Sequence, residues 1–530
     1  MKITLLDYGV GNVRSVVNAV EKLGAQLERV NAPEDILSAE KLLFPGVGNY
    51  HTMIRILNEK HYIEPLREYL AADRPFFGIC LGMQALFDGS EEDTSGYESV
   101  GFFKGRVKRF NTDLAVPHMG WNGVNMKQDS PLLDGIDPQS KFYFVHSYHL
   151  DPEDPSVALL TTTYDYEFVS AVQRGNVMGT QFHPEKSGAA GIRLLENFIK
   201  TDDLRARGPV QRQGGELSKR VIACLDVRSN DQGDLVVTKG DQYDVREDEG
   251  AVRNLGKPVE LAKRYYEEGA DEVTFLNITG FRDFPLEDMP MLQVLEETSK
   301  NVFVPLTIGG GIRDFTDANG RHYTALEVAS RYFRSGADKI SIGSDAVAVA
   351  MAYLESGERT GNSAIEEISR VYGAQAVVIS VDPQRVYVND PADAPKHTVI
   401  PADEPGPNGE KYCWYQCTIQ GGRKAVDLDA VALARSCEEL GAGEILLNCI
   451  DKDGTNSGFD HALVSAVKQA VTIPVIASSG AGCEDHFSAV FNETQADAAL
   501  AAGIFHRREV PIQAVKDHLK TQGIPVRITA

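Results

Sequence analysis

Long apolar runs are missing from this chain of 530 residues, and none approaches the ~20 residues that a membrane-spanning helix needs. Cysteines are also few. Seven in the whole chain, without regular spacing, exclude a disulfide framework and indicate a reducing compartment. Cys413 and Cys417 form a close pair, but no second pair or histidine cluster accompanies them. We therefore expect neither a zinc site nor another metal site.

Basic residues are scarce relative to acidic ones. The chain has 53 Lys and Arg against 76 Asp and Glu, a formal net charge of −23. Because nucleic-acid-binding surfaces are basic, this balance argues against a nucleic-acid partner. Any phosphate on a substrate must then be held by backbone amides and a few cations. The chain opens directly on the strand-like segment KITLLDY, so we expect no signal or transit peptide and a cytoplasmic protein.

The length exceeds what one hydrophobic core accommodates and predicts at least two domains. In residues 1–202, short apolar strands alternate with helical patterns, which predicts an α/β layer with a largely parallel sheet. Residues 203–218 are polar, with glycine and proline and almost nothing to bury, which predicts an exposed linker. A second domain is expected in residues 219–530.

Within the first domain, an apolar run ends at Cys80, which is bracketed by Gly78 and Gly82. Small residues on both sides allow a strand to turn sharply into a helix, and such a turn presents its central side chain as a nucleophile. The amide ends of a helix beginning at Leu81 would favour the thiolate. The alternative is a buried structural cysteine, because free cysteines are usually buried.

A cysteine nucleophile needs a base and a group that orients the base. Among the histidines of the domain, His183 lies in the tight segment QFHPE, just past a hydrophobic stretch and two residues before Glu185. Cys80, His183 and Glu185 are therefore predicted as nucleophile, base and orienting carboxylate. The glycine-bearing turn at 46–48 can present backbone N–H groups to a ligand oxygen, although a simple tight turn would look the same.

Four segments of this domain, PGVGNYHTMI, GICLGMQ, PHMGWN and QFHPEKS, resemble the class I glutamine amidotransferase family. The resemblance implies that Cys80 attacks the side-chain amide of glutamine, that His183 moves the proton, and that a thioester hydrolyses to glutamate with release of ammonia. It also implies an oxyanion hole at the backbone of Val47 and Gly48. By the same matching, Gln84 helps to hold glutamine.

The second domain contains eight strand candidates in order, and helical stretches separate most of them. Eight β–α units predict a (β/α)8 TIM barrel, although the domain exceeds the ~250 residues typical of that fold. The strand candidates are 221–227, 272–278, 304–308, 339–342, 376–382, 444–450, 475–477 and 498–501. The excess length is assigned to insertions near 314–323, 352–363 and 389–424, and the role of the last is left open.

The barrel sequence repeats itself, which predicts two half-barrels of four β–α units. Asp226 ends the first strand and Asp382 the fifth, which places both at the C-terminal rim, where barrel enzymes bind substrates. Facing carboxylates can act as general acid and base, and simple capping aspartates are the alternative. Turns after strands three, four, seven and eight form two symmetric anion sites and predict a substrate with two phosphates. These turns contain Gly310, Gly311, Gly343, Ser479, Gly480, Ala502 and Gly503.

Charged residues begin four of the predicted strands, at the opposite face of the barrel. Arg220, Glu272, Lys339 and Glu444 alternate in sign, and we expect them to pair because isolated buried charges are costly. A salt-bridge plug that seals the barrel would explain them. The sharper hypothesis is a gate through which a small neutral molecule such as ammonia enters.

The segments KRVIACLDV, GADEVTFLNIT, TIGGGI, GAGEILLNCIDKDGT and ADAALAAGIFH resemble the cyclase part of the imidazole glycerol phosphate synthase family. With the amidotransferase ahead of it, the chain is similar to the fused form of that family. The resemblance implies that ammonia from glutamine and phosphoribulosyl-formimino-aminoimidazole-carboxamide ribonucleotide yield imidazole glycerol phosphate and aminoimidazole-carboxamide ribonucleotide. We expect no cofactor, and a monomer with an intramolecular domain interface.

Residue roles in the barrel follow from the same resemblance. Asp226 and Asp382 are implied as the acid/base pair, Lys239 as a lysine that closes over the substrate, and Asp453 and Gly454 as contacts on the phosphate side. The resemblance also implies that the four charged residues at the strand starts form the ammonia gate.

The resemblance also makes Trp121 a candidate for the domain interface. Two residues depart from it: Asn277 stands where many relatives carry aspartate, so no acid/base role is assigned to it, and Ser479 replaces a glycine. A different ammonia-using barrel, such as one that makes pyridoxal phosphate, would need an imine-forming lysine at the rim, where the sequence predicts opposed aspartates. A regulatory chain with decayed sites would have lost its nucleophile, its base or the two rim carboxylates, and all are present.

Overall fold

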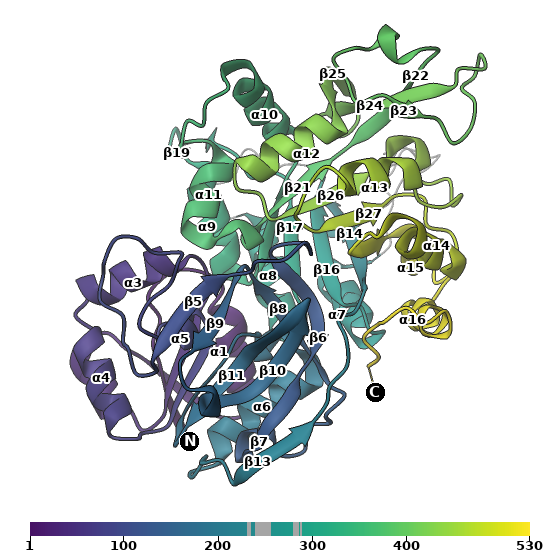
Figure 1. The fold of residues 1–530 in the computed structure, drawn as a ribbon. Coiled ribbons are helices and arrows are strands. Elements are labelled where there is room, and N and C mark those ends of the chain that lie inside the picture. Colours follow the sequence, from purple (N-terminus) through teal and green to yellow (C-terminus); the bar gives the residue numbers. More distant parts are fainter. Residues whose placement is uncertain (230–234, 239–255, 279–285, 287–288, 318, 530) are drawn as a thin grey trace.

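The computed structural model describes residues 1–530 except 230–234, 239–255, 279–285, 287–288, 318 and 530. Two α/β parts pack against each other (Figure 1), the first drawn in purple to blue and the second, a barrel, in teal to yellow. Within the described residues, no helix has the length and apolar character that crossing a membrane requires.

The first part is built on a sheet with the strand order β13-β7-β10-β11-β12-β4-β3-β1-β2, in which β9 also pairs with β11 and β5 pairs with β9. The strands of the sheet are β1 (Lys2–Leu5), β2 (Gln26–Arg29), β3 (Leu42–Gly46), β4 (Phe76–Cys80), β5 (Gly105–Arg109), β7 (Asn125–Asp129), β9 (Tyr148–Pro152), β10 (Ala158–Tyr164), β11 (Tyr166–Arg174), β12 (Val177–Thr180) and β13 (Gly208–Arg212). A separate pair is formed by β6 (His118–Gly123) and β8 (Lys141–His146).

Only half of this sheet is parallel. The strands β12, β4, β3, β1 and β2 run parallel, whereas β13, β7, β10, β11 and β12 pair antiparallel. We expected a largely parallel sheet. The difference arises between β5 and β12, where no α-helix separates successive strands, and strands joined by short connections pair antiparallel.

Helices cover both faces of the parallel half. They are α1 (Arg14–Lys22), α2 (Pro33–Ser38), α3 (Tyr50–Glu59), α4 (Ile63–Ala71), α5 (Leu81–Gln84) and α6 (Gly188–Lys200). In α1, Val16, Ala19 and Val20 are buried, the i, i+3, i+4 spacing that places side chains on one helical face. The burial of this face fixes the helix against the sheet.

The segment expected to be a linker has more structure than a linker requires. Residues 208–212 form β13, an edge strand that pairs antiparallel with β7. Leu204 is completely buried, and a Cβ on Gly123 would lie 2.1 Å from the carbonyl oxygen of Gly215. The chain therefore follows the surface of the first part before it enters the barrel.

The second part is a closed barrel of eight parallel strands, because the last strand pairs with the first. The strands are β14 (Arg220–Ser229), β16 (Glu272–Asn277), β17 (Leu306–Gly309), β20 (Lys339–Ile342), β21 (Val377–Val381), β26 (Glu444–Asn448), β27 (Val475–Ser478) and β28 (Ala498–Ala501). The surrounding helices are α7 (Pro258–Glu267), α8 (Pro290–Ser299), α9 (Ala325–Ser335), α10 (Ser344–Ser356), α11 (Ala364–Tyr372), α12 (Ala430–Glu439), α13 (His461–Lys468), α14 (Glu484–Thr494), α15 (Gly503–His506) and α16 (Ile512–Thr521). The α/β class and the eight-stranded barrel expected from the sequence are confirmed.

The structure describes the elements in the three segments that were expected as insertions. The first carries the short strands β18 (Phe315–Thr316) and β19 (His322–Tyr323), and the second lies where α10 and α11 follow one another without an intervening strand. The third forms its own sheet of β22 (Pro383–Val388), β23 (Ile400–Pro401), β24 (Tyr412–Ile419) and β25 (Lys424–Asp429). Figure 1 shows this sheet at the end of the barrel that points away from the first part.

The first part packs against the N-terminal ends of the barrel strands. Trp121 is fully buried at this junction, where its Nε1–H donates to the carbonyl of Asp271 (3.1 Å) and the Arg527 guanidinium lies 4.1 Å from its ring centroid. Lys186 pairs with Asp338 across the same junction at 2.7 Å. The C-terminal mouth of the barrel is thereby left open on the far side.

Candidate active sites

Cys80 lies at the end of β4 with φ +53° and ψ −110°, a conformation that non-glycine residues rarely adopt. Glycines are required around it for steric reasons. A Cβ on Gly82 would lie 1.9 Å from the carbonyl oxygen of Phe44, and one on Gly78 would lie 2.5 Å from the carbonyl oxygen of Gly82. The two glycines therefore let β3, β4 and α5 approach closely enough to form the sharp turn. Because α5 has only four residues, its local amides face the turn without an extended helix behind them.

The predicted base and its orienting carboxylate lie beside this turn. His183 Nδ1 is 2.9 Å from Glu185 Oε1, and both side chains are buried. Burial alone lowers the pKa of His183, but the carboxylate of Glu185 and the hydrogen-bonded sulfur of Cys80 outweigh it and raise the pKa well above its ordinary value. Gln181 Nε2 lies 3.5 Å from Cys80 Sγ on the other side. The three predicted side chains thus form one contiguous group.

The turn after β3 contains Val47 and Gly48. Gly48 has φ +124°, and a Cβ there would lie 3.0 Å from the carbonyl oxygen of Val371 in the barrel. Tyr8 Oη donates to the carbonyl of Val47, and Gln375 Nε2 of the barrel donates to the carbonyl of Gly48 (3.2 Å). The predicted oxyanion turn is therefore held by contacts from both parts of the chain.

Gln84 lies one helical turn beyond the cysteine and is almost completely buried. Its Nε2 donates to Gln181 Oε1 (3.0 Å), while its Oε1 is buried without a hydrogen-bond partner among the described residues. A buried amide oxygen with no partner is costly, which makes it a ready acceptor for a ligand.

A cavity of about 1080 Å³ occupies the C-terminal mouth of the barrel. Asp226 on β14 and Asp382 just after β21 both line it, as does Asn277. The predicted phosphate-side residues that line it are Gly310, Gly311, Gly343, Asp453, Gly454, Ser479, Gly480, Ala502 and Gly503. Lys239 lies outside the described residues. The structure thus brings the remaining predicted mouth residues to one cavity.

Asp382 is tied into its surroundings by Asn448 and Ser380. Asn448 Nδ2 donates to Asp382 Oδ1 (2.8 Å) and to Ser380 Oγ (2.9 Å). Burial raises the pKa of Asp382, Asp453 adds to this effect, and the hydrogen bonds from Asn448 and Ser380 only partly oppose it. This carboxyl therefore holds its proton more readily than an exposed aspartate does.

At the other end of the barrel, four charged side chains form a closed ring. Arg220 bonds Glu272 (2.7 Å) and Glu444 (2.6 Å), and Lys339 bonds the same two carboxylates (2.6 and 2.7 Å). Each of these side chains is at most 1% exposed. Met119 Sδ of the first part lies 3.6 Å from Lys339 Nζ. The ring therefore sits directly between the two parts.

Comparison with known proteins covers the whole chain. Residues 4–201 match the family described as "Glutamine amidotransferase class-I", and residues 220–511 match "Histidine biosynthesis protein". The chain is 58% identical over 532 residues to imidazole glycerol phosphate synthase hisHF, chloroplastic, of Arabidopsis thaliana, covering 99% of this chain and 89% of the relative. The chain belongs to the imidazole glycerol phosphate synthase family.

Of two further relatives, one matches the whole chain and the other matches a little over half of it. Imidazole glycerol phosphate synthase hisHF of Schizosaccharomyces pombe is 54% identical over 542 residues, covering 99% of this chain and 100% of the relative. Imidazole glycerol phosphate synthase subunit HisF of Methanosphaera stadtmanae is 41% identical over 312 residues, covering 59% of this chain and 100% of the relative. This chain is therefore an enzyme of histidine biosynthesis that joins a glutamine amidotransferase and a cyclase.

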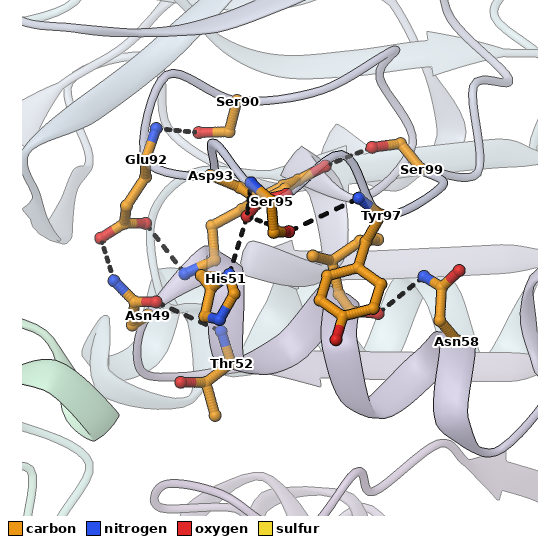
Figure 2. Close-up of polar contacts among 12 residues, drawn as sticks. Asn49, His51, Thr52, Asn58, Ser90, Glu92, Asp93, Ser95, Tyr97 and Ser99 are labelled. Carbon is orange, nitrogen blue, oxygen red and sulfur yellow. Dashed lines mark hydrogen bonds and ion pairs between the residues drawn. The ribbon is translucent and has the colours of Figure 1, made fainter.

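Glu92 is a carboxylate beside the oxyanion turn that was not predicted from the sequence. Figure 2 shows it directed at Asn49, whose Nδ2 donates to Glu92 Oε1 (2.8 Å), and Tyr50 N donates to Oε2 (2.9 Å). Burial raises the pKa of Glu92 to about 7, although these two hydrogen bonds oppose the rise. Glu92 lies in a segment without regular strand or helix pattern, so periodicity gave no signal for it.

The position of the tip of the third insertion was also not predicted from the sequence. Gln420, Gly421, Gly422 and Arg423, between β24 and β25, line the mouth cavity together with the predicted turns. The sequence left the role of this insertion open.

Proposed function

We propose that the two sites work in series. Cys80 releases ammonia from glutamine, the ammonia crosses the barrel, and the mouth uses it to convert phosphoribulosyl-formimino-aminoimidazole-carboxamide ribonucleotide to imidazole glycerol phosphate and aminoimidazole-carboxamide ribonucleotide. The chain thus acts on glutamine and a ribonucleotide with two phosphates, without nucleic acid or membrane, and as a monomer. The seven free cysteines fit a reducing compartment such as the cytoplasm.

In the first half-reaction, the raised pKa of His183 supports a thiolate–imidazolium pair. The thiolate of Cys80 attacks the amide carbon of glutamine, and the amide oxygen becomes an oxyanion facing the N–H groups of the Val47–Gly48 turn. His183 gives its proton to the leaving nitrogen, so ammonia departs and a thioester remains. Water, deprotonated by His183, then hydrolyses the thioester to glutamate, while Glu185 holds the imidazole in position and Gln84 contacts the substrate.

One observation supports the proposed transfer of ammonia between the two sites. Residues at positions i, i+2 and i+4 of a strand face the same side, so Arg220, Ile222, Cys224 and Asp226 of β14 lie in one line. Arg220 belongs to the charged ring, Ile222 and Cys224 to the barrel's inner apolar cluster, and Asp226 to the mouth cavity. This line supports a route from the ring to the mouth, with the ring as its gate.

In the second half-reaction, Asp226 and Asp382 act as the acid/base pair. The raised pKa of Asp382 suits it as the proton donor, and Asp226 then takes the part of the base. The turns at 310–311 and 343 bind one phosphate through their N–H groups, and those at 453–454, 479–480 and 502–503 bind the other.

The test uses glutamine labelled with 15N in its amide, the bisphosphorylated substrate, and an excess of unlabelled ammonium. Transfer through the barrel predicts imidazole glycerol phosphate with nearly full 15N enrichment, alongside equimolar glutamate and aminoimidazole-carboxamide ribonucleotide. Labelled ammonium without glutamine is the control for the route from solvent. Dilution of the label to the level of the free ammonium would contradict internal transfer, and absence of both products would contradict the reaction itself.

A further inference from the structure

The third insertion is fixed to the barrel rim close to the mouth cavity. Arg385 on β22 bonds Asp460 through Nε and Nη2 (2.9 and 2.5 Å), and its backbone N–H donates to Asp451 (2.7 Å). Tyr415 on β24 donates to the other oxygen of Asp460 (2.7 Å). Asp451 and Asp460 flank the 453–454 turn, so the insertion sheet is rigidly joined to one wall of the cavity.

The hairpin tip between β24 and β25 reaches the opposite wall. The backbone N–H of Gln420 donates to Ser344 Oγ (2.9 Å), and Ser344 is the first residue of α10, directly after Gly343. Gln420, Gly421 and Gly422 all have positive φ (59°, 66° and 80°), which coils the chain tightly at this point. The coil brings Arg423 back over the tip, where its Nε donates to the carbonyl of Gln420 (2.7 Å).

Arg423 is well placed for an anion. It lines the mouth cavity, and among the described residues no carboxylate forms an ion pair with its guanidinium. Since Nε is already engaged, the two terminal nitrogens can form the paired N–H contacts that guanidinium makes with phosphate. The Gly343–Ser344 turn beside it supplies the N-terminal amides of a helix of 13 residues, and Asp345 in the first turn of that helix is the nearby acidic cavity residue.

We propose that Arg423 binds the substrate phosphate seated at the Gly343–Ser344 turn, so that the insertion is a wall of the cyclase site and favours phosphorylated substrates. The inference rests on the proposed function, because it assumes a substrate with a phosphate at each end. The insertion thereby contributes a cation to a cavity that Arg228, Arg313 and Arg507 also line, in a chain whose net charge of −23 makes local cations important for phosphate binding.

The test follows the ammonium-driven cyclase reaction, which does not depend on the glutaminase. Arg423→Met is expected to raise KM for the bisphosphorylated substrate by about 10–100-fold, since one charge-assisted hydrogen-bonding group is lost. Its kcat should change by less than about threefold, because Arg423 touches no reacting atom. Inorganic phosphate should inhibit the wild type competitively, and the variant should need a correspondingly higher concentration.

Two further variants keep the outcome decisive. Lys424→Met removes the same charge from the next residue, which does not line the cavity, and should change KM by less than about twofold. Arg423→Lys keeps the charge but not the paired contacts, so its KM should lie between the wild type and Arg423→Met, and it replaces Arg423→Met if that variant does not fold. Equal KM values for the Arg423 and Lys424 variants would overturn the inference. A wild type that does not turn over the substrate would instead refute the proposed function.

Discussion

Removing one cation from the buried ring tests whether the ring is a gate. Lys339 holds Glu272 and Glu444 through contacts of 2.6 and 2.7 Å, and Arg220 holds the same two carboxylates. The ring therefore carries two positive and two negative charges. Lys339→Met has a similar length but no charge, so it leaves one carboxylate in excess in a site that is at most 1% exposed.

Breaking a buried ion pair by removing one partner costs about 3–5 kcal/mol of stability. Burial would raise the pKa of Glu272, but Lys339 and Arg220 outweigh it and hold the pKa below its ordinary value. Without Lys339, we expect this pKa to rise above that of the unfolded chain. Glu272 of the folded variant then keeps its proton in a pH range where the same glutamate of the unfolded chain has released it. This proton binding stabilises the folded variant at low pH, and the stabilisation is lost as the pH rises above about 4.3, the pKa of glutamate in the unfolded chain.

The assay combines stability with coupling. Urea unfolding of Lys339→Met should show the loss of about 3–5 kcal/mol at pH 8 and a smaller loss at pH 5.5. With glutamine and the bisphosphorylated substrate, the ratio of glutamate to imidazole glycerol phosphate should rise from near one in the wild type to well above one. Lys339→Met/Glu272→Gln restores charge balance and should recover about 1–3 kcal/mol, because the two sites are in contact.

Two results would refute this reasoning. If the changes in unfolding free energy caused by Lys339→Met and Glu272→Gln simply added in the double variant, the excess charge would not be what destabilises Lys339→Met. A glutamate-to-product ratio that stays near one in both variants would return the ring to a purely sealing role.

Three other predictions concern the two sites. Cys80→Ala should lower glutamine-dependent turnover by on the order of 10⁴-fold or more and leave ammonium-driven turnover intact, and loss of both would contradict the division of labour. Asp226→Asn should lower product formation by about 10²–10⁴-fold with either nitrogen source, and near-normal rates would show that the mouth assignment is wrong. The oxyanion turn at 46–48 should form fully only when the mouth is occupied, so glutamate release should accelerate on adding the barrel substrate; equal rates would rule this out.

The barrel could be predicted from the sequence largely because its strands are short buried apolar runs. The predicted segments 339–342 and 498–501 coincide with β20 and β28, and the other strands are found within a few residues of their predicted ends. The antiparallel half of the first sheet was not anticipated. Its strands follow one another through short connections, and β11 pairs with β9, β10 and β12, a choice of partners that local sequence patterns do not encode.

The site residues likewise divide into those that could be predicted from the sequence and those that could not. Cys80 ends β4 and Asp382 directly follows β21, whereas His183 lies three residues after β12 and Asp226 lies three residues before the end of β14. Strand ends predicted from the sequence therefore sufficed to bring these residues close together. Arg423 reaches the cavity only because three strand pairings and a coil with positive φ aim the hairpin tip there. No feature of the local sequence fixes that direction, and the role of the tip therefore emerged only from the structure.

The interior of the barrel constrains the form in which nitrogen can cross it. Between the ring and the mouth lies a buried apolar layer formed by Ile222, Cys224, Val378, Leu446, Ile476, Ala498, Leu500 and Ala502. An ammonium ion entering this layer would lose its hydration without gaining a partner, at a cost of several kcal/mol. It would also meet the positive charges of Arg220 and Lys339 at the ring. Neutral ammonia carries no charge and avoids both penalties, so in the route proposed above it is the form that crosses the barrel, and the ring is the proposed point of control.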